Sequence, residues 1–239
     1  MTSRLTATLL LVAAVLTNGA FTVLGSVFNY PDVLQEPLED ILVAFRASQT
    51  TIVAWFAVMA LSAAMLIPIA IGVGRLSTDR AMRIAVPVGI TAAAVQVIGL
   101  ARWPLLVPGY AANAASPDPV IAAAARDSFL VAHHILGAVV GETLGYLFTA
   151  AWTVLVLVAL HGVLAGRWFT LLGGGSSVLI LGGVLTPLQL PLVDTANFVG
   201  YVAWSLWLVV FAALILRQAR SSVRQAEPRR SNRALPVTP

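Results

Sequence analysis

The sequence contains no cysteine and no lysine among its 239 residues. The absence of cysteine excludes disulfides, thiolate metal sites, iron–sulfur clusters and cysteine nucleophiles. Charged residues are scarce, at 10% of the chain against about 25% for an ordinary soluble domain, whereas hydrophobic residues make up 59%. A water-soluble globule of this length cannot bury that much apolar surface, so the composition predicts a membrane protein.

Long apolar runs predict an all-α fold, a polytopic bundle of six transmembrane helices. At about 1.5 Å per residue, roughly 20 residues cross a hydrocarbon core of about 30 Å. Six segments meet this length, and together they predict one transmembrane domain over residues 1–216: approximately 5–28, 49–74, 82–103, 130–160, 168–190 and 195–216. Residues 217–239 form a basic tail, in which Arg217, Arg220 and Arg224 continue one helical face and the remainder is expected to be disordered.

All 14 basic residues are arginines, and their placement predicts topology. Cytoplasmic connections of membrane proteins carry an excess of positive charge. Three arginines fall on one side of the membrane: Arg46, Arg102 and Arg126. The other eleven fall on the opposite side, which is therefore predicted to be cytoplasmic and to contain both termini. This explains the basic tail without a nucleic-acid partner, and none is expected. The eleven arginines assigned to the cytoplasmic side are Arg4, Arg75, Arg80, Arg83, Arg167, Arg217, Arg220, Arg224, Arg229, Arg230 and Arg233.

Two connections on the opposite side are predicted to contain short helices. An amphipathic pattern from Leu34 to Phe45, with Pro37 in a first turn, is typical of an interfacial helix or an extension of the second span. Asp118 followed by Pro119 resembles a helix N-cap. A helix running unbroken from there to Leu160 would be twice as long as the hydrocarbon is thick, so we expect a cap helix over about 119–127 followed by a bend or offset.

Glu142 is the one acidic residue deep inside a predicted span, about 18 Å along the helix axis from residue 130. An acid at bilayer depth costs several kcal/mol unless it is protonated, hydrogen-bonded or facing a wet cavity. Asn18 and Gln96 reach a comparable depth and are candidate partners. Two interpretations stay open: a neutral structural acid that joins helices, or a proton or cation site.

Further polar residues from several helix ends predict an outward-open pocket for a small solute or ion. His134 lies eight residues before Glu142, on roughly the same side of a helix, and adjacent His133 points about 100° away. Interfacial hydrogen bonding is the simplest role for the two histidines. The other residues assigned to this pocket are Arg102, Gln189, Asp194, Asn197 and Tyr201.

Gly137, Gly141 and Gly145 recur at every fourth position of the predicted fourth helix. Small residues at this spacing allow another helix backbone to approach closely. The stripe therefore predicts either a packing seam within the bundle or, as the alternative, a homodimer interface.

No cofactor or metal is expected. All three histidines lie on the fourth helix or at its inner end, which is unsuitable for two axial ligands of one haem, and the zinc-protease spacing HExxH is missing. Because no hydrolase motif is visible either, an enzyme is the weakest hypothesis. The main alternative to a solute-binding protein is a regulatory or scaffolding partner in the membrane.

The segment Tyr30-Pro31-Asp32-Val33-Leu34 and the run from His134 to Gly145 resemble a widespread family of bacterial six-helix membrane proteins of unknown function. The resemblance covers nearly all of residues 5–216. It implies a multi-pass protein of the bacterial plasma membrane, and it supplies no activity or catalytic residues. The richness in Ala, Val, Leu, Gly and Arg resembles a high-GC bacterial proteome.

Overall fold

The structure, a computed structural model, describes residues 2–164, 166–188, 190 and 192–226. Its elements in these ranges are helices, and no strand occurs there. The α-helices are α1 (Ser3–Phe28), α2 (Leu38–Ala47), α3 (Gln49–Ala64), α4 (Leu66–Val73), α5 (Arg80–Leu105), α6 (Val107–Asn113), α7 (Pro119–Ala132), α8 (Gly145–Ala159), α9 (Arg167–Gly182) and α10 (Val193–Ala226). The fourth span also contains a π-helix, η3 (His133–Leu144), and three short 3₁₀ segments are η1 (Asp32–Gln35), η2 (Gly74–Leu76) and η4 (Gly183–Leu188).

Six helical stretches are long and apolar enough to cross a membrane, which confirms the predicted all-α, six-span fold. Each is numbered here as a span in chain order. They are Ser3–Phe28, Gln49–Leu76, Arg80–Asn113, Pro119–Ala159, Arg167–Thr186 and Val193–Ser221. The helix of the sixth span, α10, continues to Ala226, so the first part of the basic tail is helical. Residues 227–239 lie outside the described part of the chain.

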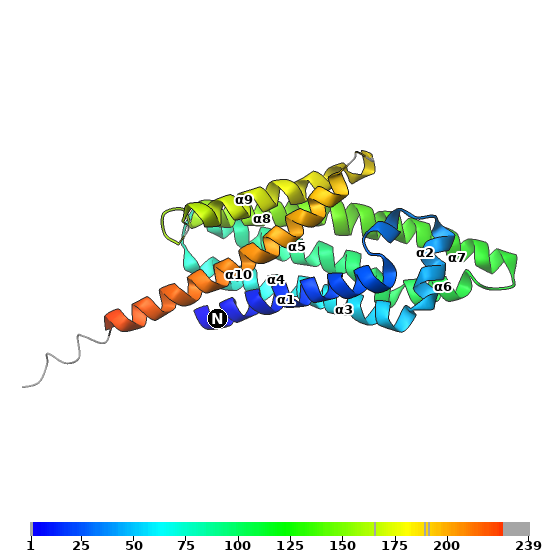
Figure 1. Cartoon of the computed structure of the whole chain (residues 1–239), viewed down its shortest axis with the longest axis horizontal. Helices are drawn as coiled ribbons and strands as arrows, with labels where there is room; N and C mark the ends of the chain where they lie inside the picture. The colour runs from blue at the N-terminus through cyan, green and yellow to red at the C-terminus, as the bar shows by residue number, and fades with distance from the viewer. Residues whose placement is uncertain (1, 165, 189, 191, 227–239) are drawn as a thin grey trace, which may run out of the picture.

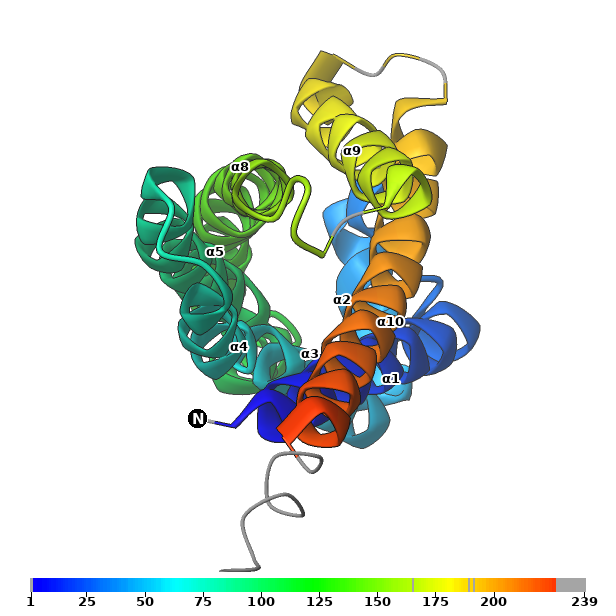
Figure 2. The same ribbon diagram turned by 90° about the vertical axis from the view of Figure 1, so that its left-hand side faces the viewer.

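The six spans form a ring in which neighbours in sequence are neighbours in space. Each span packs against the next, and α10 returns to pack against α1 (Figure 2). The start of α1, the last turns of α10 and the connections 77–79 and 160–164 lie at one end of the bundle, which we call the terminal end (Figure 1). The other end, the loop end, contains α6, the first part of α7, and α2, which lies across the bundle axis (Figure 1).

Aspartates cap the first turn of two spans, at Asp118 as the sequence suggests and also at Asp79. The Asp79 carboxylate accepts a hydrogen bond from the Ala81 amide at 2.7 Å, and the Asp118 carboxylate accepts one from the Val120 amide at 2.8 Å. These bonds satisfy amide groups that have no acceptor in the first helical turn. Pro119 then occupies the first turn of α7, where its missing N–H costs nothing.

The fourth span differs from the expectation of a cap helix followed by a bend or offset. The chain remains helical from Pro119 to Ala159, and the middle of this stretch is the π-helix η3. Its hydrogen bonds join residues five apart, and the Thr143 hydroxyl likewise donates to the carbonyl of Ala138, five residues earlier, at 2.9 Å. A long helix is thus accommodated by widening its turns rather than by ending it.

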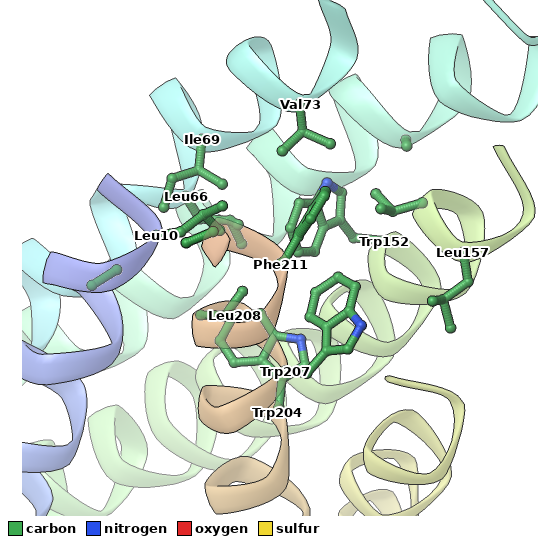
Figure 3. Close-up of a cluster of buried hydrophobic side chains, with 14 of the residues drawn as sticks. Leu10, Leu66, Ile69, Val73, Trp152, Leu157, Trp204, Trp207, Leu208 and Phe211 are labelled. Carbon is green, nitrogen blue, oxygen red and sulfur yellow. The ribbon is translucent and has the colours of Figure 1, made fainter. Parts of the chain in front are cut away.

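Two apolar clusters fill opposite ends of the ring. Near the terminal end, Trp152, Trp204, Trp207 and Phe211 pack against aliphatic side chains from α1, α4 and α10 (Figure 3). We call this group the tryptophan cluster. Near the loop end, Trp103 contacts phenylalanines from α1, α2, α3 and α7: Phe28, Phe45, Phe56 and Phe129.

A candidate ligand site between the six helices

A cavity of about 500 Å³ lies inside the ring, a size typical of small-molecule sites. All six spans and the connection between α1 and α2 contribute to its wall. Exposed Asp32 and Gln35 of that connection place one side of the cavity at the loop end. The polar and aromatic residues of the wall include Tyr30, Gln96, Arg102, His133, His134, Glu142, Tyr146, Asp194, Asn197, Tyr201 and Trp204.

The structure brings together most of the residues that the sequence assigns to a pocket. Those that line the cavity are Gln96, Arg102, His133, His134, Glu142, Asp194, Asn197 and Tyr201. Asn18 is an exception, because its side-chain amide donates to the Ala14 carbonyl of its own helix at 2.7 Å and it is not part of the wall. Gln189 lies outside the described residues.

Arg102 is a buried cation on the cavity wall, with only 6% of its surface exposed. Its guanidinium donates to the carbonyl of Gly99 and lies 5.3 Å from the centre of the Trp103 ring. Among the described residues no carboxylate lies within ion-pair distance of it. A guanidinium has five N–H donors, so most of its hydrogen-bonding capacity is available to a group in the cavity.

Gly137 provides the space that Arg102 occupies. A Cβ atom at position 137 would lie 2.7 Å from Nη2 of the guanidinium, closer than real contacts allow. The glycine stripe continues along α5, because a Cβ at Gly141 would meet the backbone of Gly99 and one at Gly145 would meet Gln96. All three glycines thus face α5 within the chain, and a homodimer through the same stripe would require α5 to move away.

Glu142 is half-buried and belongs to the same wall. Its carboxyl group makes no hydrogen bond or ion pair with any other residue that the structure describes. The two partners expected from the sequence are engaged elsewhere: Asn18 as above, and Gln96 by donating to the Thr149 hydroxyl at 2.6 Å. The carboxyl group therefore faces the cavity without a protein partner in the described chain.

Tyr30 lies in the connection between α1 and α2, beside both charges. Burial raises the pKa of its phenol, the Glu142 carboxylate raises it further, and the Arg102 guanidinium opposes the shift. The phenol consequently stays neutral at physiological pH and can donate a hydrogen bond into the cavity. Neither Tyr30 nor Tyr146 is among the residues that the sequence assigns to the pocket. Tyr146 lies four residues after Glu142, and this spacing could have indicated that the two side chains share a helix face.

Asp194 joins two connections at the loop end. Its carboxylate accepts a hydrogen bond from the Gln35 amide at 2.7 Å and another from the Thr186 hydroxyl at 2.8 Å. One donor comes from η1 and the other from η4, so the side chain ties the connection between α1 and α2 to the η4 segment that follows α9. The Asp194 carboxylate therefore has two side-chain hydrogen-bond partners, whereas the described chain supplies none to Glu142 or Arg102.

His133 and His134 lie next to each other on the wall but differ in surroundings. The His133 ring stacks on Phe129 with centroids 5.6 Å apart, and its Nδ1 atom has no hydrogen-bond partner among the described residues. His134 is exposed. In the described part of the chain, no group of three or more His, Asp or Glu side chains is arranged to hold a metal.

The cavity changes from polar to apolar away from the loop end. Its far wall contains Leu66, Ile69, Trp204 and Leu208, which also belong to the tryptophan cluster (Figure 3). The next layer of that cluster, Val73, Trp207 and Phe211, is fully buried and is not part of the wall. The cavity therefore ends blindly on an apolar floor.

The chain matches a known protein family. A family described as "Domain of unknown function (DUF4386)" matches residues 5–212. No curated protein and no solved structure matches the chain.

Proposed function

The chain therefore belongs to the DUF4386 family, whose description names no activity, and we propose that it is an integral membrane protein that binds a small solute in the cavity between its six spans. We further propose that it resides in the bacterial plasma membrane. The arginine-only basic residues, the Ala-, Val-, Leu- and Gly-rich composition and the resemblance of its loop motif support this location.

One observation carries the proposal: the cavity contains a buried cation and a carboxyl group that do not pair with each other. Arg102 and Glu142 share the wall, yet the described chain supplies no counter-ion within 4.0 Å of either. Charges removed from water are costly unless they are paired or hydrogen-bonded. A solute that enters the cavity supplies the missing partners, which favours binding over a purely structural role.

The blind floor supports binding as the first step of any movement across the membrane. A solute that leaves toward the terminal end has to pass Val73, Trp207 and Phe211, all of which are buried in the tryptophan cluster. Passage requires the helices that hold these side chains to separate. Binding and transport are therefore distinct events, and binding is the one tested first.

The test is a thermal-unfolding titration of purified protein with four solutes that share a phenyl group and differ in charge: phenylalanine, 3-phenylpropanoate, 2-phenylethylamine and 3-phenylpropanamide. A solute that binds only the folded state raises the unfolding midpoint in a saturable way. We expect at least one of the four to do so in the wild type.

Two tryptophan variants locate the effect. Ala138 lines the cavity, so Ala138→Trp fills it and abolishes the stabilisation. The adjacent Val139 is 44% exposed and is not part of the wall, so Val139→Trp is the matched control and retains the stabilisation. If none of the four solutes stabilises the wild type, or if Ala138→Trp responds as the wild type does, the proposal is wrong.

A further inference from the structure

We propose that the solute is a zwitterion with an apolar body: an acidic group bound by Arg102, an ammonium group bound by Glu142, and an apolar part directed to the tryptophan cluster. This inference rests on the proposed function and names its ligand class. It follows from the order in which charges, rings and aliphatic side chains are arranged along the cavity.

The acidic group belongs at Arg102. The guanidinium has one hydrogen-bond acceptor in the described chain, the Gly99 carbonyl; it packs on Gly137, and Arg102 lines the cavity. Guanidinium groups bind carboxylates and phosphates through parallel N–H bonds of about 2.7–2.9 Å. The neutral phenol of Tyr30 is a second donor beside it.

The ammonium group belongs at Glu142. The carboxyl has no partner in the described chain, and aromatic rings line the cavity beyond it. Tyr146 and Tyr201 have centroids 5.8 Å apart, and the Tyr201 and Trp204 centroids are 6.4 Å apart. Cations bind to the faces of such rings, so the rings and the carboxyl attract the same kind of group.

The π-helix sets the distance between the two charges. Arg102 packs on Gly137, and Glu142 lies five residues later, which is about one turn of η3. In an α-helix, residues five apart point about 140° away from each other, at about 100° per residue. The wider turns bring Glu142 back toward the face that Gly137 presents.

The resulting spacing suits a ligand whose two charged groups lie within a few bonds of each other. In an α-helix five residues would span roughly 7 Å along the axis, at about 1.5 Å per residue, and the wider turns of η3 make the span shorter. The ammonium nitrogen and carboxylate oxygen of an amino acid lie about 3 Å apart by ordinary bond lengths. Hydrogen bonds of about 2.8 Å at the two ends let such a group bridge both residues.

Neither an anion nor a cation alone supplies a partner to both Arg102 and Glu142, as a zwitterion does. An anion at Arg102 leaves Glu142 without a partner, and a cation at Glu142 leaves the buried guanidinium without one. A zwitterion neutralises both and adds no net charge to a site within the membrane. The apolar floor formed by Leu66, Ile69, Trp204 and Leu208 then receives the uncharged part of the molecule.

The test measures dissociation constants of the four phenyl solutes for the wild type at one ionic strength. We expect phenylalanine to bind at least tenfold more tightly than 3-phenylpropanoate, 2-phenylethylamine or 3-phenylpropanamide, because only phenylalanine has both charges. Equal or tighter binding of a one-charge or uncharged analogue overturns the zwitterion while leaving the proposed function standing. Absence of binding by all four overturns both.

Two charge-removing variants assign each end of the ligand. Arg102→Gln is expected to weaken binding of phenylalanine and of 3-phenylpropanoate at least tenfold, with 2-phenylethylamine changed less than twofold. Glu142→Gln is expected to weaken phenylalanine and 2-phenylethylamine in the same way, with 3-phenylpropanoate unchanged or tighter. A uniform loss for every solute contradicts the assignment. Because the wild-type comparison needs no variant, the proposal stays testable if either substitution prevents folding.

Matched controls come from α7, outside the cavity. Arg126→Gln removes a cation whose one ion pair, with Glu39 at 3.6 Å, is exposed, and Asp127→Asn removes an exposed carboxylate one residue later. Both controls are expected to change each dissociation constant by less than twofold.

A final arm distinguishes two sources of the same chemistry. Lysophosphatidylethanolamine carries a phosphate and an ammonium group on an apolar chain, whereas phenylalanine is a free solute. Tighter binding of the lipid than of phenylalanine, with the same loss in Arg102→Gln and Glu142→Gln, identifies the zwitterion as a lipid headgroup. The reverse order identifies a water-soluble zwitterion.

Discussion

At the scale of single residues, glycine decides how closely α5 and the fourth span approach. Gly99 and Gly141 face each other, and a Cβ on Gly141 would lie 2.9 Å from the Cα of Gly99. The obstacle is backbone rather than the end of a flexible side chain, so it cannot move aside easily. The same approach places Arg102 over Gly137 and so shapes the candidate site.

Gly141→Ala is therefore expected to destabilise the bundle, by about 1–3 kcal/mol of unfolding free energy, as other overpacked contacts do. Gly174→Ala in α9 is the control, because no atom lies within 4 Å of the added Cβ. There the methyl group is expected to be neutral, or stabilising by up to about 1 kcal/mol through helix propensity. Thermal unfolding in detergent measures both, and equal midpoints for the two variants would contradict the packing described.

The sequence is informative about which residues are unusual and less so about what they touch. Glu142 and Arg102 stand out because few charges occur inside apolar segments, and both do line the cavity. The partners proposed for Glu142 are not its partners, because Asn18 bonds its own helix and Gln96 bonds Thr149. Such choices depend on contacts between helices and on local backbone acceptors, which spacing along the chain does not reveal.

At the scale of elements, the sequence does not predict the π-helix η3. Its twelve residues, His133 to Leu144, have the composition of an ordinary apolar helix, with glycines at every fourth position. The length of the stretch from Pro119 to Leu160 predicts a cap helix followed by a bend or offset, and the π-helix η3 lies in this stretch. The wide turns lie against α5 at Gly99 and Arg102, a long-range contact that helical periodicity does not encode.

Asp194 links two other elements, and its removal should loosen both. Asp194→Ala eliminates the acceptor of Gln35 and Thr186, so η1 and η4 lose a shared anchor. We expect backbone amides in residues 32–36 and 184–188 to exchange with deuterium about tenfold faster, which corresponds to about 1.4 kcal/mol of local opening free energy.

Asp127→Ala serves as the comparison for this experiment, since Asp127 is exposed on α7 and is not part of the cavity wall. Its exchange in these two segments should equal that of the wild type. Unchanged exchange in Asp194→Ala would show that Asp194 does not hold the two connections together.

At the scale of the whole molecule, the six spans follow from local hydropathy, and the ring does not. Each span is recognisable in the sequence because about 20 successive apolar residues match the length of a helix that crosses a membrane. The closure of α10 against α1, which creates an interior, joins residues from opposite ends of the chain. Sequence periodicity indicates which faces are apolar, and it contains no information about which helix covers them.

The orientation of the ring in the membrane is predicted from arginine placement. Single cysteines in this cysteine-free chain test it, and Thr78 and Pro117 are suitable positions because both are exposed and neither is the aspartate that caps the following helix. An impermeant thiol reagent added to intact cells should label Pro117→Cys and should label Thr78→Cys only after lysis. The opposite pattern would invert the topology and place the loop end in the cytoplasm.

The most direct measurement is an experimental structure of the protein in lipid nanodiscs, determined with and without a saturating solute that stabilises it. We expect the charged groups of Arg102 and Glu142 to remain more than 4.0 Å apart in the solute-free protein, and solute density to lie between them above the tryptophan cluster. Two results would contradict the assignment of this cavity as a ligand site. One is a direct ion pair between Arg102 and Glu142 with the cavity closed around it, and the other is solute bound elsewhere.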